Sequence, residues 1–274
     1  MNFDNVIRNA AKPAQEEPDD YIGDDGLLYC GKCHTKKQTR ITLSDGSVIM
    51  PRCLCKCEED RRERENEEFR RKERMIKIGQ YRSAGFSDKQ LRRCTFDADD
   101  GGNATVTRVA RNYVKHFEEF SKSGQGLMFY GSVGTGKTFY ASCIANALID
   151  ECIPCMVTNF SMIVNKLSGI WDGKQEFIES LNRYSLLVID DFAMERNTEY
   201  VTEIVYNVID SRYRSGKPLI VTTNLPLQQI RNPDSMDKQR IYSRINEMCY
   251  PVEVVGRDRR TRKDSSDVMM KLYE

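Results

Sequence analysis

An eight-residue motif near the middle of the chain constrains its fold more than any other feature. Residues 131–138 read Gly-Ser-Val-Gly-Thr-Gly-Lys-Thr and match the G-x-x-x-x-G-K-[ST] pattern of a phosphate-binding loop. An apolar run at 127–130 predicts a strand before the motif, and residues 138–151 predict a helix after it, with one apolar face. A P-loop requires this order of strand, loop and helix, so the motif predicts a nucleotide-binding α/β domain.

The motif predicts a nucleotide with Mg²⁺ as its ligand. Backbone N–H groups of such a loop turn inward around the β- and γ-phosphates, and the positive end of the following helix attracts the same charge. Lys137 adds a point charge, and the Thr138 hydroxyl is expected to ligate Mg²⁺. The predicted nucleotide-binding residues are Gly131, Ser132, Val133, Gly134, Thr135, Gly136, Lys137 and Thr138.

Strand and helix patterns alternate through residues 80–274. Further strands are predicted at 155–157, 186–189, 219–222 and 252–255, and helices at 159–167, 175–183, 198–213 and 238–248. This alternation is typical of a parallel sheet flanked by helices. We therefore expect an α/β ATPase domain over 80–274, after a flexible leader at 1–20, a cysteine-rich domain at 21–57 and a charged linker helix at 58–79.

Charge and hydropathy limit the partners of the chain. Its formal net charge is only +1, so any surface that binds nucleic acid must be local. No apolar run approaches the roughly 18 residues that a membrane span needs. The first 20 residues have no apolar signal core. We expect a cytoplasmic protein with no membrane partner.

Polar side chains follow two of the predicted strands. Asp190 and Asp191 come directly after the apolar run at 186–189, and Asn224 follows the run at 219–222. Strands that end in this way place such side chains at the carboxyl edge of the sheet, beside the P-loop. We expect Asp190 to act with Mg²⁺, Asp191 to polarise the attacking water, and Asn224 to orient that water or to contact the γ-phosphate.

Arginines near the end of the chain are candidates for contact with ATP. Arg240 and Arg244 lie one helical turn apart on the same face of a predicted helix, and either could reach the γ-phosphate of a neighbouring subunit. The segment 256–260 carries Arg257, Arg259 and Arg260, and one of these could contact the phosphate in cis.

Five of the ten cysteines lie between residues 30 and 57. Cys30-x₂-Cys33 is followed by Cys53-x-Cys55-x-Cys57, and two short thiolate groups are typical of a tetrahedral zinc site. We favour Cys30, Cys33, Cys55 and Cys57 as Zn²⁺ ligands, with Cys53 as the alternate. An extended segment would instead put Cys53 and Cys57 on one side, so a turn is needed to bring Cys55 and Cys57 together.

The order of these motifs resembles the AAA+ ATPases of the DnaC/DnaI helicase-loader type over about residues 86–260. The resemblance implies that Lys137 and Thr138 belong to Walker A, Asp190 and Asp191 to Walker B, Asn224 to sensor 1, Arg244 to the arginine finger and Arg260 to sensor 2. Many AAA+ proteins have Asp-Glu in Walker B, and the shorter Asp191 is consistent with slow hydrolysis. The resemblance also implies a domain without a C-terminal helical lid.

The same resemblance implies the partners. A small N-terminal zinc-binding domain would bind the replicative DNA helicase, the AAA+ domains would self-associate, and a helical segment after the second strand would bind single-stranded DNA. The matching residues available for stacking and phosphate contacts are Lys166, Trp171, Lys174, Arg183 and Tyr184. The alternative for Trp171 and Phe177 is a place in the core.

Two other functions remain open from the sequence. An ATPase of the IstB type, which assists a transposase, would share the ATPase domain but usually lacks the cysteine-rich one. A small-molecule P-loop kinase with a structural zinc would be active as a monomer, and the paired arginines of the predicted helix 238–248 argue against it.

Overall fold

The computed structural model describes residues 16–193 and 198–258 of the chain. The chain divides into two compact units, residues 1–75 and residues 76–274. Helix α2 (Lys56–Gly85) runs through the boundary between them. It is longer at both ends than the helix predicted over 58–79.

The first unit contains two short antiparallel hairpins. Strand β1 (Tyr21–Ile22) pairs with β2 (Leu28–Tyr29), and β3 (Ile41–Thr42) pairs with β4 (Val48–Ile49). Among its described residues, the buried apolar ones are few: Leu27, Leu28, Cys30, Leu43 and Cys55. A core of this size is small for an independent fold, which is why units of this kind usually contain a metal or disulfides.

The second unit is built on a five-stranded parallel sheet in the order β6-β7-β8-β5-β9. Its strands are β5 (Gly126–Tyr130), β6 (Cys155–Asn159), β7 (Leu186–Phe192), β8 (Leu219–Thr223) and β9 (Cys249–Glu253). The predicted parallel α/β fold is therefore confirmed. Strand β9 begins earlier than the predicted run at 252–255, because Cys249 and Tyr250 already pair with the start of β5.

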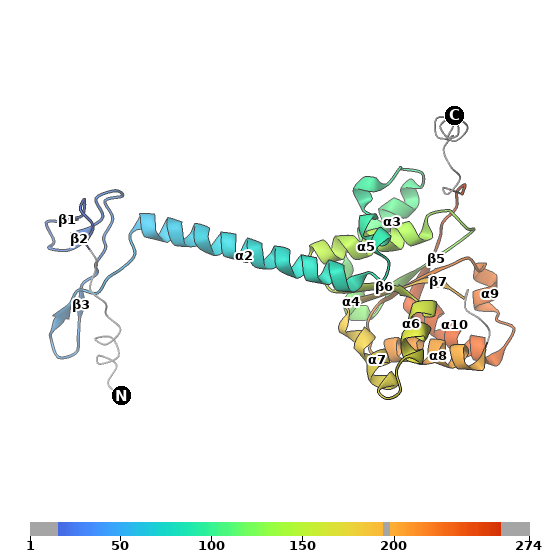
Figure 1. Cartoon of the computed structure of the whole chain (residues 1–274). Helices are drawn as coiled ribbons and strands as arrows, with labels where there is room; N and C mark the ends of the chain where they lie inside the picture. The colour runs from blue at the N-terminus through green and yellow to red at the C-terminus, as the bar shows by residue number, and fades with distance from the viewer. Residues whose placement is uncertain (1–15, 194–197, 259–274) are drawn as a thin grey trace, which may run out of the picture. The chain divides into compact units, whose positions relative to one another are not determined.

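Helices cover both faces of this sheet (Figure 1). Those of the second unit are α3 (Ala104–Lys115), α4 (Phe117–Ser123), α5 (Lys137–Asp150), α6 (Phe160–Ser168), α7 (Lys174–Ser180), α8 (Glu199–Arg214), α9 (Leu227–Arg231) and α10 (Met236–Met248). Short 3₁₀ turns lie at Lys89–Arg93, Phe96–Ala98 and Leu181–Arg183. The helix predicted over 175–183 thus ends at Ser180 and continues as 3₁₀.

Two apolar cores lie on opposite faces of the sheet, because successive strand residues point to opposite sides. Leu187 and Ile189 of β7 pack with α6, α8 and α10, whereas Leu186 and Val188 pack with α3 and α5. The sheet is therefore buried on both faces, as the continuous apolar runs of β7 and β8 predict. This packing holds the carboxyl ends of β5, β7 and β8 side by side, where the predicted site residues lie.

Candidate nucleotide site and thiolate cluster

The P-loop connects β5 to α5. Gly136, the residue before α5, has a φ of +101°, and Gly134 has a φ of +79°. Both angles lie in the left-handed region, which a residue with a side chain adopts only at a cost. A Cβ atom added at Gly134 would also lie 1.8 Å from the Asp258 Oδ1 atom, so the carboxylate of Asp258 lies directly against the loop.

Lys137 points back over the loop that precedes it. Its Nζ donates hydrogen bonds to the carbonyl oxygens of Gly131 (2.9 Å) and Ser132 (2.7 Å), and the residue is only 5% exposed. The Thr135 hydroxyl donates to the Ser132 carbonyl as well, at 2.9 Å. These bonds hold the loop curved around the ammonium group, which is the shape that lets its N–H groups bind a phosphate.

Asp190 accepts hydrogen bonds from hydroxyl groups of two other elements. The Thr138 Oγ1 atom at the start of α5 lies 2.8 Å from Asp190 Oδ1, and the Thr222 Oγ1 atom of β8 lies 2.6 Å from it. Burial raises the pKa of Asp190, while these two hydrogen bonds oppose the shift. The structure thus joins the two residues predicted to hold Mg²⁺, a hydroxyl and a carboxylate, which are oxygen ligands of the kind that Mg²⁺ prefers.

Asp191 diverges from Asp190 at an irregularity in β7. The pairing of β7 with β8 shifts register between Ile189 and Phe192, and Asp191 has a φ of +50°. Its side chain is exposed, whereas that of Asp190 is half-buried. Because the two acids have different surroundings, they can serve different roles, one toward a metal ion and one toward solvent.

Thr222 connects this irregular segment to the next strand. Its hydroxyl accepts a hydrogen bond from the Asp191 N–H (3.0 Å) while it donates to Asp190. Thr223 follows and donates to the Phe192 carbonyl at 2.9 Å. Asn224 comes directly after this strand, at the same sheet edge as the P-loop and the two acids. In the sequence, the only signal for these hydrogen bonds is that Thr222 and Thr223 follow directly after an apolar run.

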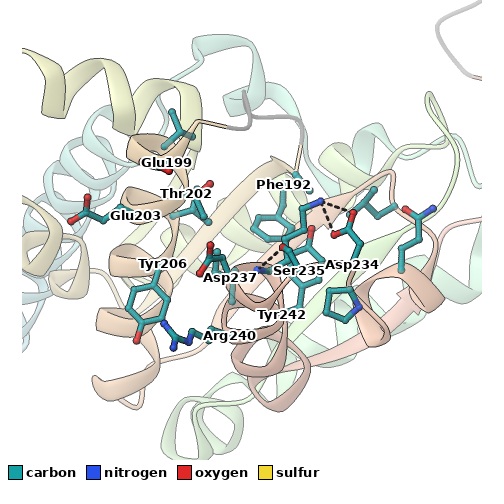
Figure 2. Close-up of a pocket in the computed structure, with 18 of the residues that line it drawn as sticks. Phe192, Glu199, Thr202, Glu203, Tyr206, Asp234, Ser235, Asp237, Arg240 and Tyr242 are labelled. Atoms are coloured by element: carbon teal, nitrogen blue, oxygen red, sulfur yellow. Dashed lines mark hydrogen bonds and ion pairs between the residues drawn. The ribbon is translucent and has the colours of Figure 1, made fainter.

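Arg240 and Arg244 have different surroundings on α10. Arg244 forms an ion pair with Asp210 of α8, at 2.6 Å between Nη2 and Oδ1. Arg240 is exposed and lines a groove of about 1020 Å³ between α8, α9 and α10 (Figure 2). Phe192 and Leu225, which follow the two acids and Asn224, lie in the same groove. Arg260, the predicted sensor 2 residue, lies outside the described residues.

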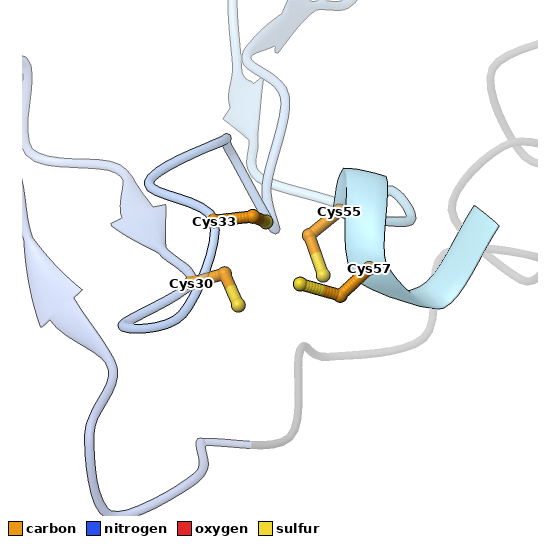
Figure 3. Close-up of side chains that lie close together, drawn as sticks. All are labelled: Cys30, Cys33, Cys55 and Cys57. Atoms are coloured by element: carbon orange, nitrogen blue, oxygen red, sulfur yellow. The ribbon is translucent and has the colours of Figure 1, made fainter. Parts of the chain in front are cut away.

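The four favoured cysteines of the first unit lie together. The Sγ atoms of Cys30, Cys33, Cys55 and Cys57 are all within 4.8 Å of one another (Figure 3). Cys53 points elsewhere, since its Sγ donates to the Lys36 carbonyl at 3.4 Å. The turn that brings Cys55 and Cys57 together is the start of α2, whose first turn contains Cys57.

The surroundings of the thiols fit a bound cation. A hydrogen bond with the Thr35 hydroxyl, 3.1 Å from Sγ, lowers the pKa of Cys33. Burial raises the pKa of Cys55, and the neighbouring Cys33 raises that of Cys57. Four thiols this close cannot all ionise without a positive charge between them, and a divalent ion such as Zn²⁺ supplies one.

Other contacts hold the two thiolate segments in place. Thr35, besides its bond to Cys33, accepts from the Lys56 N–H at 2.9 Å. Asp20 accepts from the Gly31 N–H at 3.2 Å and forms an ion pair with the buried Lys37. Such outer contacts orient metal ligands. His34 is hydrogen-bonded to the Tyr21 hydroxyl.

The segment predicted to bind single-stranded DNA presents aromatic and basic side chains. Trp171 is fully exposed, so the alternative that places it in the core is wrong; it lies on a surface loop between α6 and α7. Phe177 is partly buried against the core, with Lys166 over its ring at 5.1 Å. Lys174 lies over the ring of Tyr200 at 5.5 Å.

In the part of the chain that the structure describes, none of the helices has the length and hydropathy that a membrane-spanning segment requires.

The strand order, the P-loop between β5 and α5, and the acids at the end of β7 define a P-loop ATP-binding domain of the AAA+ class. The family model of the IstB-like ATP binding protein matches residues 57–267, which is more than half of the chain. The chain therefore belongs to the IstB-like ATP-binding family.

Two proteins named as helicase loaders are similar to this chain in sequence. The replicative helicase loader DnaC of Buchnera aphidicola subsp. Schizaphis graminum is 25% identical over 147 residues, which are 51% of this chain and 58% of that protein. The replicative helicase loader DnaI of Bacillus subtilis is 23% identical over 176 residues, 60% of this chain and 56% of that protein. The chain thus spans little more than half the length of these relatives.

Two solved structures share the fold. A crystal structure of the DnaC helicase loader has a TM-score of 0.52 at 25% identity and covers 61% of this chain and 100% of its own. A crystal structure of DnaI has a TM-score of 0.53 at 22% identity, with 63% and 96% covered.

Proposed function

We propose that this chain is an ATP-dependent loader of a replicative DNA helicase. The observation that carries the proposal is the similarity of the AAA+ domain to proteins named replicative helicase loaders, in both sequence and fold. The cysteine-rich unit adds a second support, because it provides a separate surface with which a loader could bind its helicase. The cytoplasm, where chromosomal replication takes place, is the expected location.

The geometry of the sheet edge supports ATP hydrolysis. Lys137 and the P-loop N–H groups would bind the phosphates, and Thr138 and Asp190 would hold Mg²⁺, which neutralises charge on the β- and γ-phosphates. Asp191 is exposed at the same edge, where it can accept a hydrogen bond from the attacking water. Asn224 would orient that water, and Arg260 would contact the nucleotide in cis.

Self-association completes the ATP site in this proposal. Arg244 of one subunit would act on ATP bound by the next, so hydrolysis would be slow and would depend on oligomer formation. Single-stranded DNA would bind at the surface that carries Trp171 and Lys174, because an exposed aromatic ring beside basic groups suits base stacking and phosphate contact. Hydrolysis would then release the loader.

Binding to the host's replicative helicase tests the proposal. We expect the full chain to retain the helicase in a pull-down, and a chain without residues 1–57 to lose it while still binding ATP. A thermal unfolding measurement on the shortened chain controls for folding of the second unit, which has its own two cores. A helicase retained by neither form would refute the loader function.

The family match favours one alternative function. An IstB-like ATPase that assists a transposase would bind long duplex DNA without sequence preference and would not bind the helicase. The same pull-down, run beside a duplex DNA binding assay, separates the two functions.

A further inference from the structure

The Arg244 side chain lies in a site formed mainly by helix α8. Its Nη2 atom lies 2.6 Å from Asp210 Oδ1 and 3.2 Å from the Tyr206 hydroxyl. Its Nη1 atom donates to the Arg240 carbonyl at 3.3 Å. The guanidinium therefore has a charged partner and polar contacts on two helices, which is more than an ordinary surface arginine makes.

Two tyrosine rings add to this site. The guanidinium carbon of Arg244 lies 4.8 Å from the ring centroid of Tyr206 and 5.8 Å from that of Tyr213. The Tyr213 hydroxyl lies 2.9 Å from a carboxylate oxygen of Glu247 on α10. A planar guanidinium can lie flat against an aromatic ring, whereas the ammonium group of lysine interacts with a ring only as a point charge. We call Tyr206, Asp210 and Tyr213 the α8 cradle.

The cradle restrains the side chain without enclosing it. The side chain of Arg244 remains 23% exposed, and that of Asp210 is 16% exposed. Asp210 also pairs with Arg214 at 3.0 Å through its other oxygen, which fixes the orientation of the carboxylate. A long side chain that is held in one conformation and still reaches solvent is suited to a partner that arrives from outside.

We propose that Asp210 and Tyr206 are positioning residues for Arg244, which hold its guanidinium in the conformation required to reach ATP on a neighbouring subunit. This inference rests on the inter-subunit ATPase proposed above. A charged group must be placed to within about 1 Å to stabilise a transition state, and fixing it beforehand removes the cost of ordering it at each turnover. Arg240, exposed on the groove wall, has no such cradle among the described residues.

The competing explanation is structural: the cradle could simply join α8 to α10. The two explanations differ in what the loss of Asp210 changes. A positioning role lowers the turnover number of the junction and leaves the stability of the chain nearly unchanged, whereas a structural role lowers the melting temperature.

A mixing experiment with full-length chains separates the two explanations. Lys137→Ala subunits cannot bind ATP but can donate Arg244, and Arg244→Ala subunits bind ATP but cannot donate. Mixing them should restore ATPase activity that neither shows alone. Asp210→Asn in the Lys137→Ala subunit should lower the restored kcat roughly 10-fold with an unchanged KM for ATP. The melting temperature of this doubly substituted subunit should stay within about 2 °C of its Lys137→Ala parent, since a partly exposed ion pair contributes less than about 1 kcal/mol.

Matched variants complete the test. Tyr206→Phe in the same Lys137→Ala subunit keeps the ring but loses the hydroxyl, so it should lower the restored kcat by less than Asp210→Asn does. Asp234→Asn removes an exposed ion pair with Lys238 at the start of α10 and should leave the restored rate unchanged. A larger fall in melting temperature, or a restored rate that Asp210→Asn does not lower, would overturn the positioning role. A starting mixture that restores no activity would instead refute the inter-subunit arginine, and the positioning role with it.

Discussion

At the scale of single residues, Asp190 is a carboxylate that is held in a largely buried position. Burial is the largest influence on its pKa and raises it, against hydrogen bonds from Thr222 and Thr138. The fold therefore disfavours the ionised form, even though this is the form that a metal ion requires. Such a residue destabilises the protein when no ligand is bound, but it is available to bind a cation.

We predict that Asp190→Asn stabilises the chain when nucleotide and divalent metal are absent. The amide oxygen can still accept from both hydroxyls, and the buried charge is gone. Its melting temperature at pH 7 should rise by about 2–4 °C, which corresponds to about 1 kcal/mol in a domain of this size. Calorimetry measures this shift, and the same variant should lose Mg²⁺-dependent ATP hydrolysis.

The effect of Asp190 on stability should depend on pH. The folded-state pKa lies above the unfolded-state pKa, so wild-type stability falls as the pH rises between them, because the unfolded chain releases its proton first. The Asn variant lacks this decline, so the two melting temperatures should converge in acid. A variant that is less stable than wild type at pH 7 would contradict the account.

Asp190 and Thr222 also show which site residues a sequence can reveal. Two acids after an apolar strand form a local pattern that predicts the sheet edge. The role of Thr222 depends on β8 lying beside β7, which is set by strand order and not by neighbouring residues. The same holds for Asp210, whose partner Arg244 lies on another helix.

At the scale of elements, one buried arginine joins α8 to the sheet. Arg212 is fully buried and donates to the carbonyl oxygens of Tyr184, Ser185 and Pro218 at 2.7–3.1 Å. These residues precede β7 and β8, at the amino edge of the sheet and opposite the P-loop. Burial lowers the pKa of Arg212 to about 10, so it remains charged at pH 7.

Arg212→Met should destabilise the second unit without changing its affinity for ATP. The three carbonyl groups would lose their donor inside the protein, at a cost of about 3 kcal/mol or more. The melting temperature should fall by roughly 6–12 °C. The ATP affinity of the folded fraction, measured by titration at low temperature, should stay unchanged because the P-loop lies at the other edge.

The matched control lies on the same helix. Arg214 has a 67% exposed side chain and an ion pair with Asp210, so Arg214→Met should change stability by less than about 1 kcal/mol. Comparable losses in both variants would show that the buried hydrogen bonds of Arg212 are unimportant. The apolar face of α8 can be predicted from the helical spacing of its apolar residues. The burial of Arg212 cannot be predicted in this way, because a charged residue does not fit that pattern.

At the scale of the whole molecule, the two units differ in what stabilises them. The second has two apolar cores, whereas the described part of the first, from residue 16 on, has few buried apolar residues and a cluster of four thiols. If the cluster binds the Zn²⁺ that we propose, the first unit should depend on that ion for its stability, and the second should not. The paired cysteine segments were visible in the sequence, but the choice of Cys55 over Cys53 depends on where α2 begins.

We predict that Cys55→Ser and Cys53→Ser have different effects. The first removes a thiol of the cluster, so the purified chain should lose its zinc, and amide protons between residues 20 and 57 should exchange faster. The second should retain about one zinc per chain, measured by elemental analysis. Nucleotide binding should be unchanged in both, and zinc retained by Cys55→Ser would show that Cys53 or His34 can replace the ligand.

Cys57 lies in the first turn of α2, so a metal ion bound by the thiol cluster would affect how this helix forms. The first turn of a helix is the unfavourable one to form, because several residues are ordered for one hydrogen bond. An ion held by Cys55 and Cys57 would order that turn in advance and so act as a nucleation site. Loss of the ion would then first unfold the N-terminal turns of α2. The helical content of this segment would therefore depend on the zinc concentration.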